Sequence, residues 1–175
     1  MMHPSIDDGN VVRVIFRLNS DEWHGNSSEG LWAEPLEGSD SGDLYRLRNS
    51  PFFARGVSFE DVVRAKPSEE YGGTLEATAL IQKCGHSNYM LLFEEGDKRV
   101  ADIWTKLKDM GCAYESTAIK LSIGKRWLYA VDVPPLADIT KVQAILKEGE
   151  EQGIWMCQEG SLGHEVPSKP TSPKT

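Results

Sequence analysis

Hydrophobic and polar residues alternate in the first third of the chain, which is the pattern of short, half-buried β-strands. The clearest run is residues 11–18, whose alternating apolar positions are Val12, Val14, Phe16 and Leu18. Strand character returns in three shorter runs, at residues 31–36, 44–48 and 61–65. We therefore expect a small β lobe over residues 11–70, arranged as a meander or a barrel.

The second half of the chain mixes strands with two helices. Residues 97–111 have apolar side chains at the spacing of a helical stripe, and Asp97 is placed to cap this helix. A second helix is expected from Asp138 to Gly153 on the same grounds. The strands expected here are residues 75–82, 88–95, 114–122, 126–133 and 154–158.

From Asn88 onward the predicted order is strand, helix, strand, strand, helix, strand. This is the order of the split β-α-β, ferredoxin-like arrangement, in which two helices pack on one face of an antiparallel sheet. The fold class is therefore α+β, with a ferredoxin-like lobe over residues 74–162. The boundary between the lobes falls in residues 66–73, where Pro, Ser and the Gly72-Gly73 pair interrupt regular structure.

The two ends of the chain have little apolar surface. Residues 1–10 are expected to be flexible, and residues 163–175, with three prolines among Ser, Thr and Lys, are expected to be a disordered tail. The N-terminus contains no basic region followed by an apolar run, and no later stretch approaches the length that spans a bilayer. We therefore expect a cytoplasmic protein that does not contact a membrane.

Charge and cysteine content narrow the classes of partner. The formal net charge of −8 repels nucleic-acid backbones and favours a basic protein partner. Cys84, Cys112 and Cys157 are widely separated without a C-x-x-C pair, so they predict neither a zinc site nor a disulfide framework. An odd number of cysteines also fits a reducing compartment.

Recognisable catalytic and cofactor motifs are missing from the sequence. The four histidines show no metal-ligand spacing, and no glycine-rich phosphate-binding motif occurs, so we predict no metal and no cofactor. His86, between Cys84 and Ser87, is a candidate catalytic residue, but nucleophile and base normally come from distant segments. A turn histidine that is hydrogen-bonded to the backbone is the simpler interpretation.

The segment Lys125-Arg-Trp-Leu-Tyr129 has the basic and aromatic character of the strands with which RNA-recognition motifs stack bases. Tyr89 and Phe93 offer a second aromatic strand. The acidic charge of the chain and the imperfect aromatic spacing favour the alternative, that these rings belong to the core.

The densest local signal is Asn49-Ser-Pro-Phe-Phe-Ala-Arg-Gly-Val57, followed by Phe59-Glu-Asp-Val-Val-Arg-Ala65. One interpretation is structural: Phe52 and Phe53 plug the small barrel, while Arg55 pairs with an acid such as Asp61. The alternative is that this segment lines a pocket or a partner surface.

These two runs, together with Cys84-Gly-His-Ser87 and Leu128-Tyr-Ala-Val-Asp-Val-Pro134, resemble a bacterial family known as a domain of unknown function. The resemblance covers roughly residues 11–163. Some relatives look like immunity proteins that accompany polymorphic toxins, so the resemblance implies a protein that neutralises a cognate toxin. It implies no catalytic residue.

Two functional hypotheses follow. In the first, the protein is a non-enzymatic immunity protein that binds a basic toxin through acidic loops, with an exposed tryptophan as anchor. The candidate partner-binding residues are Glu34, Glu37, Asp40, Asp43, Glu94, Glu95, Asp97, Trp23 and Trp32. In the second, it is an enzyme or sensor of small molecules with a pocket between the two lobes near Arg55, Asp61 and His86.

Overall fold

The computed structural model describes residues 10–38, 40 and 42–167. Short strands dominate both halves of the chain, and two helices interrupt the second half. The strands are β1 (Val12–Arg17), β2 (Ser28–Pro35), β3 (Leu44–Leu47), β4 (Val62–Pro67), β5 (Leu75–Gln82), β6 (Ser87–Phe93), β7 (Ala113–Leu121), β8 (Gly124–Val133) and β9 (Met156–Ser161). The helices are the 3-10 turn η1 (Glu69–Tyr71), α1 (Arg99–Asp109) and α2 (Ile139–Glu151).

The first five strands form a closed barrel. Neighbouring strands from β1 to β5 pair antiparallel, and the barrel closes where β1 meets β5 in parallel at Val14–Leu75 and Ile15–Glu76. Its inward side chains make a small core, as the period of two predicts. The fully buried members include Val14, Leu31, Ala33, Leu47 and Val63.

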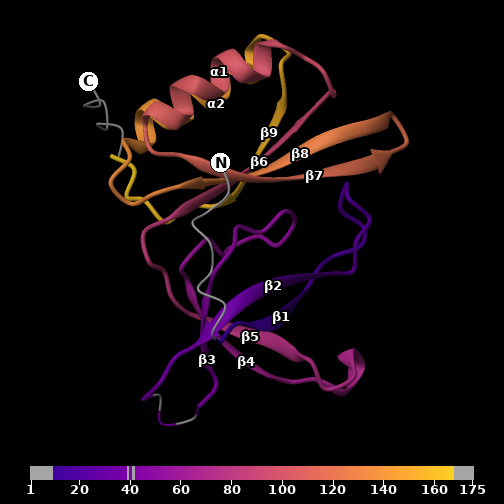
Figure 1. Ribbon diagram of the computed structural model, residues 1–175, viewed down its shortest axis with the longest axis vertical. Helices are drawn as coiled ribbons and strands as arrows, with labels where there is room; N and C mark the ends of the chain where they lie inside the picture. Colours follow the sequence, from indigo (N-terminus) through magenta and orange to yellow (C-terminus); the bar gives the residue numbers. More distant parts are fainter. Residues whose placement is uncertain (1–9, 39, 41, 168–175) are drawn as a thin grey trace, which may run out of the picture.

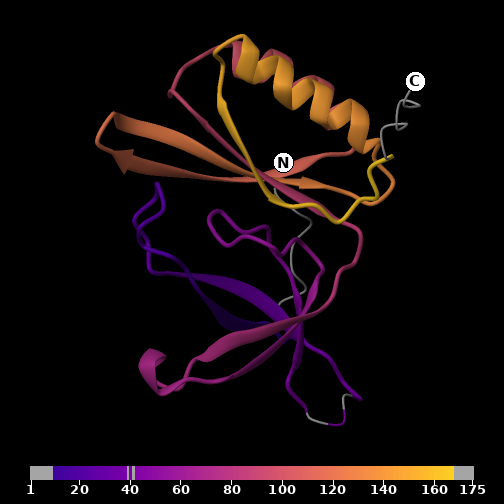
Figure 2. The same cartoon turned by 180° about the vertical axis from the view of Figure 1, so that it is seen from behind.

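The other four strands form an antiparallel sheet in the order β7-β8-β6-β9. Helices α1 and α2 lie on one face of this sheet, and the barrel lies on the other, so the molecule has three layers (Figures 1 and 2). The core between helices and sheet contains Leu91, Ile103, Leu107, Val131, Val142 and Leu146. The mixed α+β class and the predicted order of elements after Asn88 agree with this arrangement.

The boundary between the lobes is the main correction to the sequence analysis. Strand β5 was assigned to the second lobe, but it pairs with β4 and β1 and is the fifth strand of the barrel. The Gly72-Gly73 turn therefore lies inside the barrel lobe, between β4 and β5. The chain crosses to the second lobe later, in residues 83–86. Residues such as Gly, Pro and Ser mark the end of a strand, but the same residues occur in turns within a lobe and in linkers between lobes. Composition alone therefore could not distinguish the two cases.

The two helices begin close to their predicted positions. Asp138 caps α2, because its carboxylate accepts the backbone N–H groups of Thr140 and Lys141. Asp97 accepts the N–H of Arg99 at 3.0 Å, although the N-cap position of α1 belongs to Lys98. Among the described residues, no helix is long and apolar enough to cross a membrane.

The prediction of a disordered tail is wrong for its first residues, Gly163 and His164, which are hydrogen-bonded to the fold. The backbone N–H of Gly163 donates to Ser87 Oγ at 2.9 Å, and His164 bridges Ser87 Oγ and the carbonyl of Pro134 at 2.6 and 2.9 Å. The tail prediction for residues 168–175 and the flexibility prediction for residues 1–9 lie outside the described residues. The proline-rich composition of this segment gave no indication that His164 is hydrogen-bonded to the fold.

Candidate functional site

The segment 49–57, the densest signal in the sequence, joins the two lobes. Glu29 of β2 accepts three consecutive backbone N–H groups from it: Phe52 N–H at 2.6 Å, Phe53 N–H at 2.9 Å and Ala54 N–H at 2.7 Å. From the sheet side, Glu115 of β7 accepts the N–H of Ser50 at 3.1 Å. Buried backbone N–H groups need such partners, so the two carboxylates fix the path of this segment.

One interpretation of the sequence placed Phe52 and Phe53 in the core of the barrel. The structure contradicts this placement. Both phenylalanines pack against Met90, Leu92 and Leu128, which lie on the face of the sheet opposite the helices. These three residues belong to the central strands β6 and β8, where every second side chain points to this face. The two phenylalanines therefore cover part of the open face of the sheet and leave the rest uncovered.

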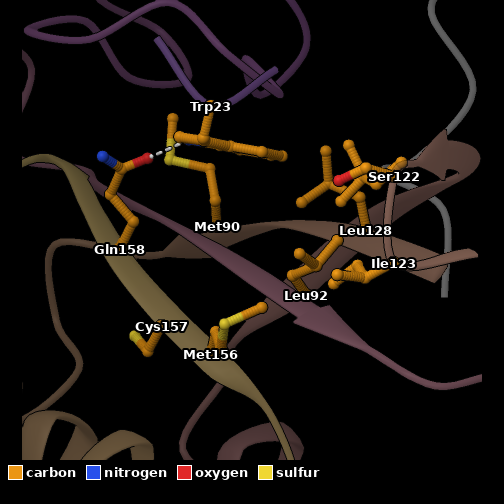
Figure 3. Close-up of a pocket in the computed structure, with 10 residues that line it drawn as sticks. Trp23, Met90, Leu92, Ser122, Ile123, Leu128, Met156, Cys157 and Gln158 are labelled. Carbon is orange, nitrogen blue, oxygen red and sulfur yellow. Dashed lines mark hydrogen bonds between the residues drawn. The ribbon is translucent and has the colours of Figure 1, made fainter.

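The uncovered part of that face is an apolar cleft between the lobes, with a volume of about 490 Å³ (Figure 3). Its floor crosses all the strands of the sheet, and Trp23 from the barrel lobe lies over it. Trp23, Ile123 and Met156 are large apolar side chains that remain 41%, 56% and 55% exposed at this cleft. The lining residues are Trp23, Met90, Leu92, Leu121, Ser122, Ile123, Leu128, Met156, Cys157 and Gln158.

Trp23 reaches the cleft from the loop between β1 and β2, which rises from the barrel toward the sheet (Figures 1 and 2). Its indole Nε1–H donates to Gln158 Oε1 of β9 at 3.0 Å. On the barrel side the indole ring contacts Phe53, with ring centroids 6.0 Å apart. The loop therefore spans the gap between the lobes at one end of the cleft.

A second, polar cluster lies where the chain crosses between the lobes. His86 Nδ1 is 2.7 Å from Asp132 Oδ1, and both residues are buried. Because a carboxylate only accepts, Nδ1 has the proton in this pair. His86 Nε2 is 3.9 Å from Glu60 Oε2, and Arg48 lies 3.2 Å from the same carboxylate group. Glu60 itself has φ +65°, a backbone conformation that residues other than glycine rarely adopt.

This polar cluster has the His-Asp pair of a general base, and the contacts of His86 in the described structure are with Asp132, Glu60 and Phe59 rather than with Ser87 or Cys84. Ser87 is fully buried and accepts N–H groups through its hydroxyl. Burial and the nearby Asp61 carboxylate raise the pKa of the Cys84 thiol, which disfavours its thiolate form. The cluster therefore holds the crossing segment in place and is a weaker candidate for catalysis than the sequence suggested.

Of the three residues predicted to form a pocket, Asp61 and His86 lie near each other, whereas Arg55 is exposed at the surface. Asp61 is buried, but it accepts the backbone N–H groups of Ser58 and Cys84, each at 2.9 Å. The expected pairing of Asp61 with Arg55 is wrong, since Arg55 is exposed at the surface. His86 pairs with Asp132 and faces Glu60, neither of which was singled out from the sequence.

The predicted partner-binding acids lie at opposite ends of the molecule. Glu34 lies near the end of β2, and Glu37, Asp40 and Asp43 follow this strand at the barrel end, whereas residues 94–97 connect β6 to α1 at the helix end (Figures 1 and 2). Most of these acids are matched by local cations: Asp43 by Arg64, Glu94 by Arg126, Glu95 by Lys125 and Asp97 by Arg99. Glu34 lies 4.0 Å from Arg48, while Glu37 and Asp40 are exposed.

The two predicted tryptophan anchors differ in their surroundings. Trp32 is exposed on β2, where its backbone N–H donates to Asn49 Oδ1 at 2.7 Å. Trp23 lines the cleft. The resemblance of residues 125–129 to an RNA-binding strand is misleading, because Trp127 and Tyr129 pack with Tyr89 and Phe93 in the core on the helix side of the sheet.

Buried carboxylates give the junction between the lobes a distinctive pH dependence. Burial raises the pKa of Glu29, Asp61 and Glu115, although backbone N–H groups that donate to each of them oppose the shift. A carboxyl whose pKa is higher in the folded than in the unfolded chain binds protons more readily when folded. It therefore lowers stability at high pH, and that loss is relieved as the pH falls through its folded pKa.

We expect the Glu115→Gln variant to lack the part of this pH dependence that comes from Glu115. At pH 7 its free energy of unfolding, measured with urea, should compare more favourably with the wild type than at pH 5, because the variant lacks the partly buried charge at position 115 that the wild type neutralises on acidification. A single amide oxygen can still accept the Ser50 N–H. If the stability of the variant relative to the wild type is the same at both pH values, or is higher at pH 5 than at pH 7, the Glu115 carboxylate does not titrate as described.

Comparison with known proteins gives a family but no activity. A family model described as "Domain of unknown function (DUF4265)" matches residues 29–157, which is well over half of the chain. The chain belongs to this family. The DUF4265 match begins at Glu29, the residue that holds segment 52–54, and ends at Cys157 on the wall of the cleft. The description of the family states no ligand, partner or reaction.

Among solved structures, a crystal structure of a hypothetical protein from Neisseria gonorrhoeae is similar to this DUF4265 protein. The TM-score is 0.63 and the sequence identity 17%, over 93% of this chain and 100% of that chain. At this identity the likeness shows a shared fold alone. The search of curated proteins found no match.

Proposed function

We propose that this protein is a non-enzymatic binding protein that holds a neutral, apolar small molecule in the cleft between its lobes. The observation behind the proposal is the concentration of exposed apolar side chains at one cavity. Single exposed apolar residues are ordinary on a protein surface, but Trp23, Ile123 and Met156 line one continuous cleft. Its volume of about 490 Å³ falls within the range of small-molecule sites.

The lining defines the class of ligand. None of the described residues that line the cleft is charged, and Ser122 and Gln158 are the polar side chains among them. A charged ligand would lose its hydration here without gaining a partner. Two methionines and an indole favour a flat or aromatic guest, because thioethers are adaptable and pack well against rings. The expected ligand is therefore uncharged and largely apolar.

The polar groups near the lobe junction support binding rather than catalysis. The buried carboxylates Glu29, Asp61 and Asp132 accept hydrogen bonds from backbone N–H groups or from His86. Within the part of the chain that the structure describes, no cluster of His, Cys, Asp or Glu could hold a metal ion. These groups are used to join the lobes around the cleft.

Two finer predictions stay proposals. We infer that the second lobe is ferredoxin-like, which the strand order β7-β8-β6-β9 and the helices on one face support.

The immunity hypothesis also stays a prediction. The acidic net charge and the exposed acids of the 34–40 segment favour it, whereas the ion pairs of residues 94–97 disfavour that second loop as a steering surface.

We expect carboxylates placed on the cleft wall to weaken binding of an uncharged aromatic probe. N-phenyl-1-naphthylamine, whose fluorescence rises in apolar surroundings, should bind the wild type with saturation. Ile123→Asp and Met156→Asp should each raise its Kd about tenfold or more, because the new charge must stay hydrated where the probe binds. Both native side chains are more than half exposed, so the fold should tolerate the changes.

Leu136→Asp is the matched control, since Leu136 is a fully exposed apolar residue that does not line the cleft. It should leave the Kd unchanged within twofold. Equal Kd values for all three variants and the wild type, or no saturable binding by the wild type, would contradict the proposed site.

A further inference from the structure

The loop between β1 and β2, residues 18–27, is a compact turn structure that ends over the cleft. Its base is closed by the Leu18 N–H, which donates to the Ser27 carbonyl at 2.9 Å. Within it, the Glu22 N–H donates to Asn19 O at 3.1 Å, and the Gly25 N–H donates to Glu22 O at 3.0 Å. We call these residues the Trp23 loop. At its tip, Trp23 is hydrogen-bonded to Gln158 across the end of the cleft.

His24 is the internal support of the Trp23 loop. Its side chain is only 2% exposed, and its Nδ1 accepts the backbone N–H of Asn26 at 2.9 Å. Its ring packs edge-on against Trp23, with centroids 5.4 Å apart, and lies 4.8 Å from Phe53 by the same measure. The imidazole therefore connects the loop that covers the cleft to the segment that joins the lobes.

The hydrogen bond from Asn26 requires neutral imidazole. A backbone N–H can only donate, so Nδ1 must present its lone pair, and the proton of the neutral ring is on Nε2. Protonation would add a hydrogen to Nδ1, so that Nδ1–H and the Asn26 N–H would both be donors facing each other. The His24 side chain is only 2% exposed, so an imidazolium in this position would be held away from water as well as losing its hydrogen bond, and both effects favour rearrangement of the loop.

Two acids face His24. Glu22 of the same loop has Oε2 at 3.6 Å from Nε2, and Glu29 of β2 lies within electrostatic range of the ring. The other groups packed against the imidazole, Trp23 and Phe53, are uncharged. Both carboxylates attract an imidazolium, so protonation draws the ring away from the Asn26 N–H and toward the acids.

We propose that the Trp23 loop is a lid over the apolar cleft and that protonation of His24 opens it, so that the protein releases its ligand at acidic pH. This inference rests on the proposed function and adds regulation to the same site. His24 acts as a positioning residue, because it touches Trp23 and does not line the cleft itself.

The first test is probe binding at two pH values. For the wild type, the Kd of N-phenyl-1-naphthylamine should rise about tenfold between pH 7.5 and pH 5.5, as the cost of holding an imidazolium away from water implies. His24→Asn should bind more weakly than the wild type at pH 7.5, but with a Kd that changes less than twofold with pH. An asparagine side-chain oxygen can accept the Asn26 N–H and does not titrate.

His164→Asn is the matched control, because His164 is also hydrogen-bonded within the fold but packs at Ser87 and Pro134, away from the lid. This variant should keep the wild-type pH dependence. Equal pH dependence in the wild type and in His24→Asn would overturn the inference, even if the probe binds well at pH 7.5.

A second readout needs no ligand. In protein labelled with 5-fluorotryptophan, the Trp23 resonance can be assigned with Trp23→Phe and should move toward its solvent-exposed position as the pH falls from 7.5 to 5.5. The same resonance should stay fixed in His24→Asn. Absence of probe binding at every pH would refute the proposed function, whereas a Trp23 resonance that does not move in the wild type would refute the lid.

Discussion

Glu29→Ala is expected to lower the free energy of unfolding by about 3 kcal/mol, because three buried or partly buried N–H groups lose their common acceptor at once. The pKa of Glu29 is raised because desolvation of the carboxylate exceeds the opposing effect of the three hydrogen bonds, so their contribution to stability is partly offset by the cost of burying the charge. Urea unfolding followed by tryptophan fluorescence measures the difference. Segment 52–54 should also become accessible to proteolysis in this variant.

Glu34→Ala is the matched control for Glu29→Ala. Glu34 lies on the same strand, is exposed, and has only a distant contact with Arg48 at 4.0 Å. Loss of so weak a surface pair should change stability by less than about 0.5 kcal/mol. Two variants of similar stability would mean that Glu29 does not anchor the segment between the lobes.

Asp132→Ala is expected to have a similarly large effect, about 3 kcal/mol, since it leaves His86 buried without its partner. A double-mutant cycle with His86→Ala separates the interaction free energy of the His86–Asp132 pair from the free energy lost with the packing of each side chain. Removing both residues should cost at least about 1 kcal/mol less than the sum of the single changes.

Additive effects in that cycle would contradict a coupled His86–Asp132 pair. Asp109→Ala, at the exposed end of α1, serves as the control for replacing an aspartate and should be nearly neutral. Because Asp132 lies on β8 and His86 just before β6, the coupling reports how firmly the crossing segment is held to the sheet.

Local patterns in the sequence were sufficient for most elements of the fold. Alternation predicted β1 and β8, and the apolar stripe with Asp138 as cap predicted α2, because these signals depend on neighbours in the chain. The strand β5 was predicted at the correct residues but in the wrong lobe. Its pairing with β1 is a contact between residues about 60 positions apart, which strand composition does not encode.

The importance of segment 49–57 was visible in the sequence, but its role was not. Two phenylalanines suggest a core, and only the structure shows that they cover the sheet of the other lobe. The acceptors that hold the segment, Glu29 and Glu115, are acids in ordinary strand contexts. A buried glutamate in a strand has no signature of its own unless its distant N–H partners are known.

The sequence predicted a pocket between the two lobes, but it did not point to the apolar cleft that the structure shows. The residues chosen from the sequence were the chemically reactive ones, Arg55, Asp61 and His86. The residues that line the cleft are mostly apolar and come from β6, β7, β8, β9 and the Trp23 loop. Trp23 was singled out, but as an anchor for a partner. Apolar residues on an uncovered sheet face cannot be distinguished from core residues before the layers are known.

The most direct test of the central claim is to locate a bound ligand crystallographically. Crystals of the protein soaked with 2-bromonaphthalene, an uncharged aromatic compound, should show a bromine anomalous peak in the cleft between Trp23 and the side chains of Met90, Leu128 and Met156. The peak should be absent in Met156→Asp crystals and present in Leu136→Asp crystals. A peak only at another surface, such as the groove beside Trp104 and Tyr114, would contradict the account.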